Sequence, residues 1–252
     1  GVALTDRGLS FLPYARRAIE VLEAGVTAAR QAQAGQRGLV TIGVLESLSG
    51  SFLGPALASF HAAHPEVDVL VRAGRHELLV ELLRDGVIAL ALLAWPCPES
   101  LTLPLEVLLS LRERVPLVAA PQHPLARAPR LGPGWPALAR PFLVMRWWLT
   151  LPPALARLAQ ATRPTIDVPM DTGRQMVLDG VGAGFFPWMQ VADAVRAGQL
   201  RELAPPDVGP LWRDSALVRR AEGAPLAPAA AALVATLRER AAQVGLAAEP
   251  RA

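Results

Sequence analysis

The chain has 252 residues, of which 52% are hydrophobic and 19% charged, so it can bury one large core or two smaller ones. It lacks the charge excess that keeps a segment disordered. Its net charge is only +3, and the basic residues are scattered along the chain. That scatter argues against the concentrated basic stripe that neutralising nucleic-acid phosphates requires.

We expect no membrane span, because the longest apolar stretches, such as residues 86–96, are broken by Pro, Gly or charge. The N-terminus lacks the pattern of a secretory signal, and the single cysteine, Cys97, cannot form an internal disulfide, so the expected compartment is the cytoplasm. No nucleophile elbow or phosphate-binding loop is present. The histidines lack the spacing of metal ligands. We therefore expect no catalytic residue, no metal site and no cofactor; the histidines are His61, His64, His76 and His123.

Residues 6–34 show one continuous helical pattern, in which apolar side chains recur alternately every three and four residues. Pro13 should bend or weaken its first turns. At about 1.5 Å per residue, the helix is longer than a domain of this size needs for its own core, so we predict that it dimerises. The alternative is a helix folded back on its own domain. The predicted dimer seam consists of Leu12, Ala15, Ile19, Leu22 and Val26.

An alternation of strands and helices follows the glycines at positions 35 and 38. The first series has strands at 39–45, 67–73, 87–94, 105–111 and 115–119, with helices at 52–63 and 76–84. A Pro- and Gly-rich stretch at 121–136 interrupts it. The second series has strands at 141–145, 165–168 and 184–186 and helices at 153–161, 172–179 and 191–197, and the chain closes with a strand at 215–219 and a helix at 228–244. Two similar α/β lobes are therefore predicted.

Short motifs along the chain carry a family resemblance. Residues 4–8 read LTDRG, residues 82–92 read LLRDGVIALAL, residues 123–125 read HPL and residues 177–182 read VLDGVG. In this order and spacing they resemble the LT-x-x-G, L-x-x-G-x-x-D-L-A-I, HPL and V-x-x-G-x-G segments of LysR-type transcriptional regulators. The acidic residue of the family's D-L-A-I strand is Ala89 here, so its role cannot be carried over.

The resemblance implies an α/β fold with a long N-terminal linker helix, followed by two Rossmann-like lobes of the type II periplasmic-binding-protein fold. The expected divisions are residues 1–35 for the end of the wing and the linker helix, 38–116 with 215–246 for lobe I, and 117–214 for lobe II. The resemblance also implies that the intact protein is a homodimer or homotetramer. It would bind DNA through an N-terminal winged helix-turn-helix, most of which lies outside this chain.

A small effector is expected between the lobes, at the carboxyl ends of strands, where open α/β sheets bind ligands. Hydroxyls and helix-end N–H groups would suit an organic carboxylate. The expected effector-binding residues are Ser47, Ser49, Ser51, Trp95, Arg146, Trp147, Asp171 and Thr172.

Each of these residues also has a purely structural interpretation. Ser47, Ser51 and Thr172 can be helix caps or turn residues, Arg146 can form a surface ion pair, and the tryptophans can simply pack. The alternative function is a two-lobed solute-binding receptor without a DNA-binding role. Such a receptor would share the lobes but lack the coiled-coil linker, so the helical seam favours the regulator.

Overall fold

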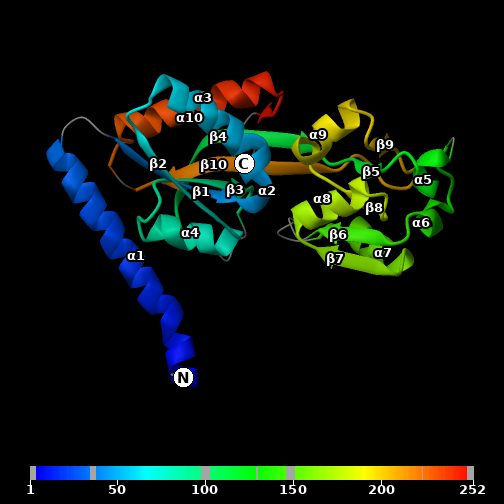
Figure 1. The fold of residues 1–252 in the computed structure, drawn as a ribbon, viewed down its shortest axis with the longest axis horizontal. Helices are drawn as coiled ribbons and strands as arrows, with labels where there is room; N and C mark the ends of the chain where they lie inside the picture. Colours follow the sequence, from blue (N-terminus) through cyan, green and yellow to red (C-terminus); the bar gives the residue numbers. More distant parts are fainter. Residues whose placement is uncertain are drawn as a thin grey trace.

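The computed structural model describes residues 4–34, 38–97, 103–128, 130–145, 151–222 and 224–248. Within these ranges, no helix is both long enough and apolar enough to cross a membrane. The chain forms a long N-terminal helix and two β-sheets with their own helices, and the long helix lies outside both sheets (Figure 1). The prediction of two α/β units preceded by a long helix is therefore confirmed.

The long helix, α1 (Asp6–Ala34), is continuous although it contains Pro13. A polar cluster joins it to the first sheet's helix α4 (His76–Arg84). Arg17 Nη1 lies 2.6 Å from Glu81 Oε2, and Arg17 Nε pairs with the carboxylate of Asp85. These ion pairs give α1 a polar attachment to α4.

The first sheet has six strands in the order β11-β4-β10-β3-β1-β2. They are β1 (Leu39–Leu45), β2 (Asp68–Gly74), β3 (Leu90–Ala94), β4 (Leu105–Arg114), β10 (Trp212–Arg220) and β11 (Ala247–Ala248). Strands β1, β2 and β3 are parallel, and β10 runs antiparallel to β3 and β4. Helices α3 (Gly54–Ala63) and α10 (Pro228–Gln243) lie on one face and α4 on the other (Figure 1). Cover on both faces explains the nearly continuous apolar runs of β1 and β3.

The second sheet has five strands in the order β7-β6-β8-β5-β9. They are β5 (Leu117–Ala119), β6 (Phe142–Met145), β7 (Thr165–Val168), β8 (Ala183–Phe185) and β9 (Arg201–Leu203). Its helices are α5 (Pro124–Arg127), α6 (Trp135–Leu138), α7 (Pro153–Ala161), α8 (Met170–Leu178) and α9 (Trp188–Arg196). Figure 1 places α8 and α9 on the side of this sheet that faces the first one.

The chain passes between the two sheets twice, and both passages lie side by side. Strand β4 leads into β5, and the chain returns from β9 into β10. Because β4 and β10 pair antiparallel, Glu113 stands opposite Arg213 at the end nearest the second sheet. We propose residues 38–116 with 215–246 as the first lobe and residues 117–214 as the second, and we count all of β10, from Trp212, with the first lobe because it pairs with β4.

The glycine motif before β8 has a steric reason. Gly182 has a φ of +76°, and a Cβ at this position would lie 2.1 Å from the carbonyl oxygen of Pro141. Glycine alone tolerates both conditions without strain. The close approach lets β8 start beside β6, where Phe142 pairs with Ala183.

The predicted bounds of α1, β1, α4, α7 and β7 agree with the structure to the residue. Several others were wrong where the two lobes meet: β4 ends at Arg114 rather than at residue 111, and β5 begins at Leu117 rather than at residue 115. A short helix α2 (Glu46–Leu48) and a π-helical turn η1 (Ser49–Leu53) follow β1, whereas a helix was predicted only from residue 52. Helix α9 begins at Trp188 rather than at residue 191, and β10 begins at Trp212 rather than at residue 215. The elements α5, α6, β9 and β11 were not predicted.

Candidate functional site between the two lobes

The segment that follows β1 carries three serines at the carboxyl end of the strand. Ser47 is buried in α2, while Ser49 and Ser51 are half-buried in the π-helical turn η1. Such single π-helical turns occur frequently at functional sites. The predicted serines therefore lie together on the first lobe, next to the second.

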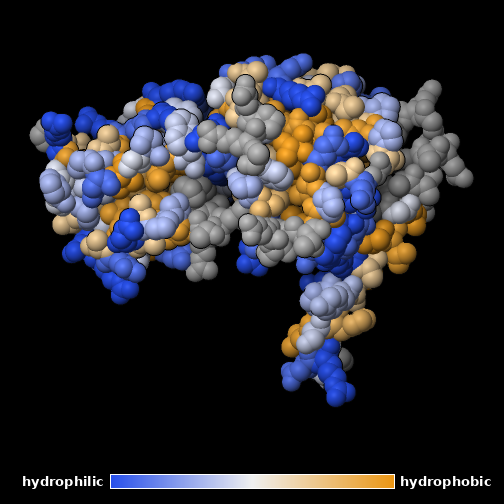
Figure 2. All heavy atoms as spheres, turned by 180° about the vertical axis from the view of Figure 1, so that it is seen from behind, coloured by the Kyte–Doolittle hydropathy of each residue, from blue (hydrophilic) through white to orange (hydrophobic). Residues whose placement is uncertain are grey.

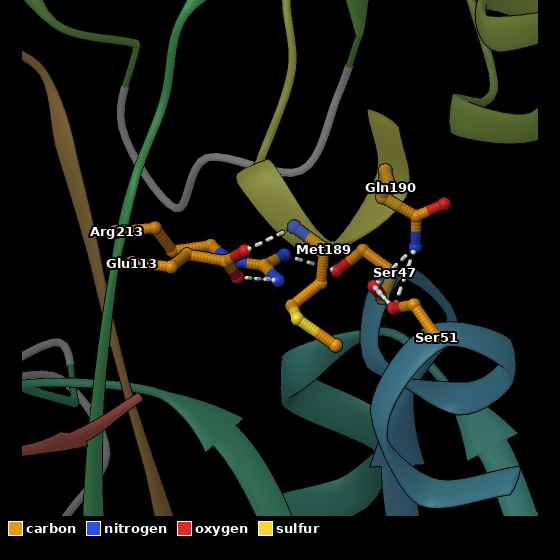
Figure 3. Close-up of polar contacts among 6 residues, drawn as sticks. All are labelled: Ser47, Ser51, Glu113, Met189, Gln190 and Arg213. Carbon is orange, nitrogen blue, oxygen red and sulfur yellow. Dashed lines mark hydrogen bonds and ion pairs between the residues drawn. The ribbon is translucent and has the colours of Figure 1, made fainter. Parts of the chain in front are cut away.

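Helix α9 of the second lobe contacts this segment directly (Figure 3). Gln190 Nε2 donates a hydrogen bond of 2.6 Å to the carbonyl oxygen of Ser47 and another of 3.2 Å to Ser51 Oγ. Arg174 Nε of α8 donates a hydrogen bond of 2.7 Å to the backbone carbonyl oxygen of Gln190. Gln190 thus connects the first lobe to two helices of the second.

A buried ion pair lies beside these contacts, on β4 and β10, which we call the two crossover strands because they lead to and from the second sheet. The side chains of Arg213 and Glu113 are 3% and 4% exposed. Arg213 Nε donates to Glu113 Oε1 at 2.8 Å, Nη2 pairs with the same oxygen, and Nη1 donates to Ser47 Oγ at 2.7 Å. The guanidinium therefore links both crossover strands to the serine that follows β1.

The second carboxylate oxygen of Glu113 faces the second lobe. Glu113 Oε2 accepts a hydrogen bond of 2.9 Å from the backbone N–H of Met189 in the first turn of α9. The first N–H groups of a helix have no intrahelical partner and carry partial positive charge, so a carboxylate is favoured there. The Met189 side chain packs against the hydrophobic core of the first lobe. Figure 3 shows Glu113 between Arg213 and the start of α9.

The first residue of α9 is held as well. The guanidinium carbon of Arg114 lies 3.6 Å from the centroid of the Trp188 ring, a distance suited to cation–π attraction. Arg114 also pairs with Glu202 of β9. Three consecutive residues, Trp188 to Gln190, therefore contact β4 or the β1 turn. We call Ser47, Ser51, Glu113, Met189, Gln190 and Arg213 the lobe junction.

The remaining predicted site residues lie around the lobe junction or outside the described part of the chain. Trp95 follows β3, is half-buried and packs on the α4 side of the first sheet. Asp171 and Thr172 are exposed in the first turn of α8. Arg146 and Trp147 fall outside the described residues. The structure thus joins Ser47 and Ser51 through Gln190, while Asp171 and Thr172 remain a proposal for the second lobe.

The sequence did not predict four residues of the lobe junction, which are Glu113, Met189, Gln190 and Arg213. Glu113 and Arg213 are 100 residues apart, so only the fold shows that they are paired. A signal existed nonetheless, because each is a charged residue beside an apolar strand pattern.

Metal and thiol chemistry find no support in the described residues. Within them, no group of three or more His, Cys, Asp or Glu side chains is placed to hold a metal ion. Burial raises the pKa of the Cys97 thiol to about 11. At neutral pH this thiol is therefore protonated and a poor nucleophile.

The contribution of Gln190 can be measured by replacing it with Ala. Gln190→Ala should lower the free energy of unfolding by about 1–2 kcal/mol, because two hydrogen bonds to the first lobe are lost. Urea denaturation followed by tryptophan fluorescence measures this loss. The matched control Gln199→Ala changes an exposed glutamine just after α9 and should cost less than about 0.5 kcal/mol. Equal stability of Gln190→Ala and the unaltered chain would contradict the role given to this contact.

Comparison with known proteins agrees with the geometry. Residues 33–242 match the family model described as LysR substrate binding domain. The HTH-type transcriptional regulator CfxR of Cupriavidus necator is 38% identical over 127 residues, which cover 49% of this chain and 38% of that protein. The HTH-type transcriptional regulator CbbR of Cereibacter sphaeroides is 29% identical over 236 residues, 90% of this chain and 73% of that protein. CfxR and several other curated regulators are matched over only about two fifths of their own length.

Solved structures show the same fold. CbnR, a LysR family transcriptional regulator, superposes with a TM-score of 0.67 at 17% identity, over 94% of this chain and 82% of that chain. The reduced OxyR regulatory domain of Pseudomonas aeruginosa gives a TM-score of 0.59 at 17% identity, over 81% and 98%. The predicted type II periplasmic-binding-protein fold is thereby confirmed. With a family model that spans most of its residues, the chain belongs to the LysR substrate binding domain family.

Proposed function

We propose that this chain is the regulatory part of an effector-responsive bacterial transcription regulator of the LysR type. In the intact protein, a small molecule bound between the lobes would change their angle, and α1 would relay the change to DNA-binding heads. The family match and the relatives named as transcriptional regulators support this proposal. They favour it over a solute-binding receptor or an enzyme. A regulator of this kind works in the cytoplasm.

The observation that carries the proposal is the lobe junction. Polar groups of the second lobe reach the β1 turn of the first lobe, beside the two strands through which the lobes are connected. A ligand can shift a conformational equilibrium only by its differential affinity for the two states. A small molecule bound at this place touches both lobes, so its affinity depends on their angle.

An organic carboxylate is the effector class that we propose. On the first lobe, Ser49 and Ser51 offer hydroxyls next to the buried Ser47. On the second, Thr172 and the first turn of α8 offer a hydroxyl and free N–H groups, as anion sites at helix starts do. Trp95 would provide an apolar wall, and Arg146 and Trp147 complete the proposed set.

We propose that α1 dimerises the chain. Its seam residues Ile19, Leu22 and Val26 are 56%, 68% and 49% exposed, and Leu12 and Ala15 are half-buried. Figure 2 shows apolar surface along this projecting helix. Contiguous apolar surface of this kind marks protein interaction sites, and the heptad spacing fits a second copy of the same helix.

Sedimentation of the chain at micromolar concentration tests the dimer. We expect a dimer, and we expect Leu22→Asp to weaken it at least about tenfold, because a charge would be buried in an apolar seam. The control Ala18→Asp adds the same charge at an exposed position outside the seam. A monomeric unaltered chain would contradict the proposed linker.

Ligand titration tests the proposed function itself. A panel of small aromatic and aliphatic carboxylic acids is screened by tryptophan fluorescence and calorimetry. For an acid that binds, Thr172→Ala should weaken the affinity roughly fivefold, as the loss of one neutral hydrogen bond of about 1 kcal/mol predicts. Ser47→Ala should weaken it as well, whereas Ser59→Ala, on the exposed face of α3, should not. Undiminished binding by both Thr172→Ala and Ser47→Ala would place the effector elsewhere.

A further inference from the structure

Glu113 lies among groups that favour a negative charge. Arg213 supplies a guanidinium on one side, and the first turn of α9 supplies the Met189 N–H on the other. Ser47 Oγ accepts from Arg213 and so fixes the direction of the guanidinium. The two carboxylate oxygens are divided between these donors, with Oε1 on Arg213 and Oε2 on Met189.

The carboxylate belongs to Glu113 of β4, and it connects the first lobe to the second. Glu113 and Arg213 belong to β4 and β10 of the first sheet, whereas Met189 belongs to the second lobe. Burying two charges costs several kcal/mol per ion, and an apolar pair of similar volume would often serve stability as well. The position of the pair has a clearer reason: the carboxylate of Glu113 holds the first turn of α9 in place.

We propose that Glu113 is a built-in carboxylate ligand, which occupies an anion site made by Arg213 and the N-terminus of α9 and thereby holds the second lobe against the first. The site is of a size and charge to take a small free carboxylate once the side chain of Glu113 is removed. The further consequence, that an effector carboxylate competes with Glu113 for these donors, rests on the proposed function. The site itself does not.

Acetate is the probe, because it matches the part of the side chain that Glu113→Ala removes. Glu113→Ala keeps Cβ and removes the CH₂–COO⁻ fragment, which has the size of acetate. Acetamide has nearly the same shape without the charge. Glu106→Ala is the matched control, because Glu106 lies on the same strand and pairs with Arg219 of β10 in an exposed ion pair.

The first measurement is the melting temperature of the two variants and the unaltered chain in acetate, acetamide or sodium chloride at equal ionic strength. Acetate should raise the melting temperature of Glu113→Ala in a saturable manner, by about 3–6 °C at a tenfold excess over its dissociation constant. Acetamide and chloride should raise it less. Glu106→Ala and the unaltered chain should not respond saturably to acetate.

The second measurement is amide hydrogen exchange at Met189, which reports the hydrogen bond itself. Glu113→Ala should expose this amide and speed its exchange at least about tenfold, and acetate should restore its protection. Glu113→Gln, which leaves no room for acetate, should show no acetate effect. These readouts need neither effector nor DNA, so they separate this proposal from the proposed function.

The proposal is overturned if acetate stabilises Glu113→Ala no more than acetamide does, or if the Met189 amide exchanges at the same rate with and without Glu113. If Glu113→Ala is recovered only as aggregate, it is refolded in acetate and in acetamide. A higher yield of folded chain in acetate supports the site. Equal yields contradict it.

Discussion

A carboxylate and a guanidinium, those of Glu113 and Arg213, meet in the interior where the two crossover strands lie side by side. Removing both charges from water is costly, so the pair persists only because neighbouring groups complete its hydrogen bonds. Ser47 accepts from the guanidinium, and the Met189 N–H donates to the carboxylate. The turn after β1, strands β4 and β10 and the start of α9 all meet at this contact. Together with the contacts of Gln190 and Trp188, it joins the two sheets.

The topology explains why this contact can influence the angle between the two lobes. Since the chain passes between the lobes only through β4 and β10, a rotation of one lobe must bend or twist these two strands near their junction ends. Helix α9 adds a third link through Met189 and Gln190. Arg17 of α1 pairs with Glu81 and Asp85 of the first lobe, so α1 has a direct polar connection to that lobe. The proposed relay from effector to linker helix therefore has named polar contacts at both of its ends, at the lobe junction and between α1 and α4.

Much of the fold was predictable because local patterns of apolar and polar residues determine its helices and strands. The apolar run of β1 and the amphipathic spacing of α4 and α7 specify both type and bounds of these elements. The beginning of α9 was placed three residues late, because the apolar residues around Phe186 and Pro187 read as the end of a strand. Ser47 was identified by its position after the first strand, but its partner Arg213 is 166 residues away. Local periodicity carries no information on such a pairing, so the sequence indicated Ser47 and Ser51 of the lobe junction and the fold supplied its other four residues.

Glu113 and Arg213 act as one coupled, buried unit. A double-mutant cycle measures this most directly, from the free energies of unfolding of Glu113→Gln, Arg213→Met and the double variant. Each single change should cost about 3–5 kcal/mol, because it leaves the other group buried without its counter-charge, and the double change should cost much less than their sum. The exposed cross-strand pair Glu106 and Arg219, on the same two strands, should show a coupling of less than about 1 kcal/mol in the same experiment. Additive losses at Glu113 and Arg213 would contradict the account.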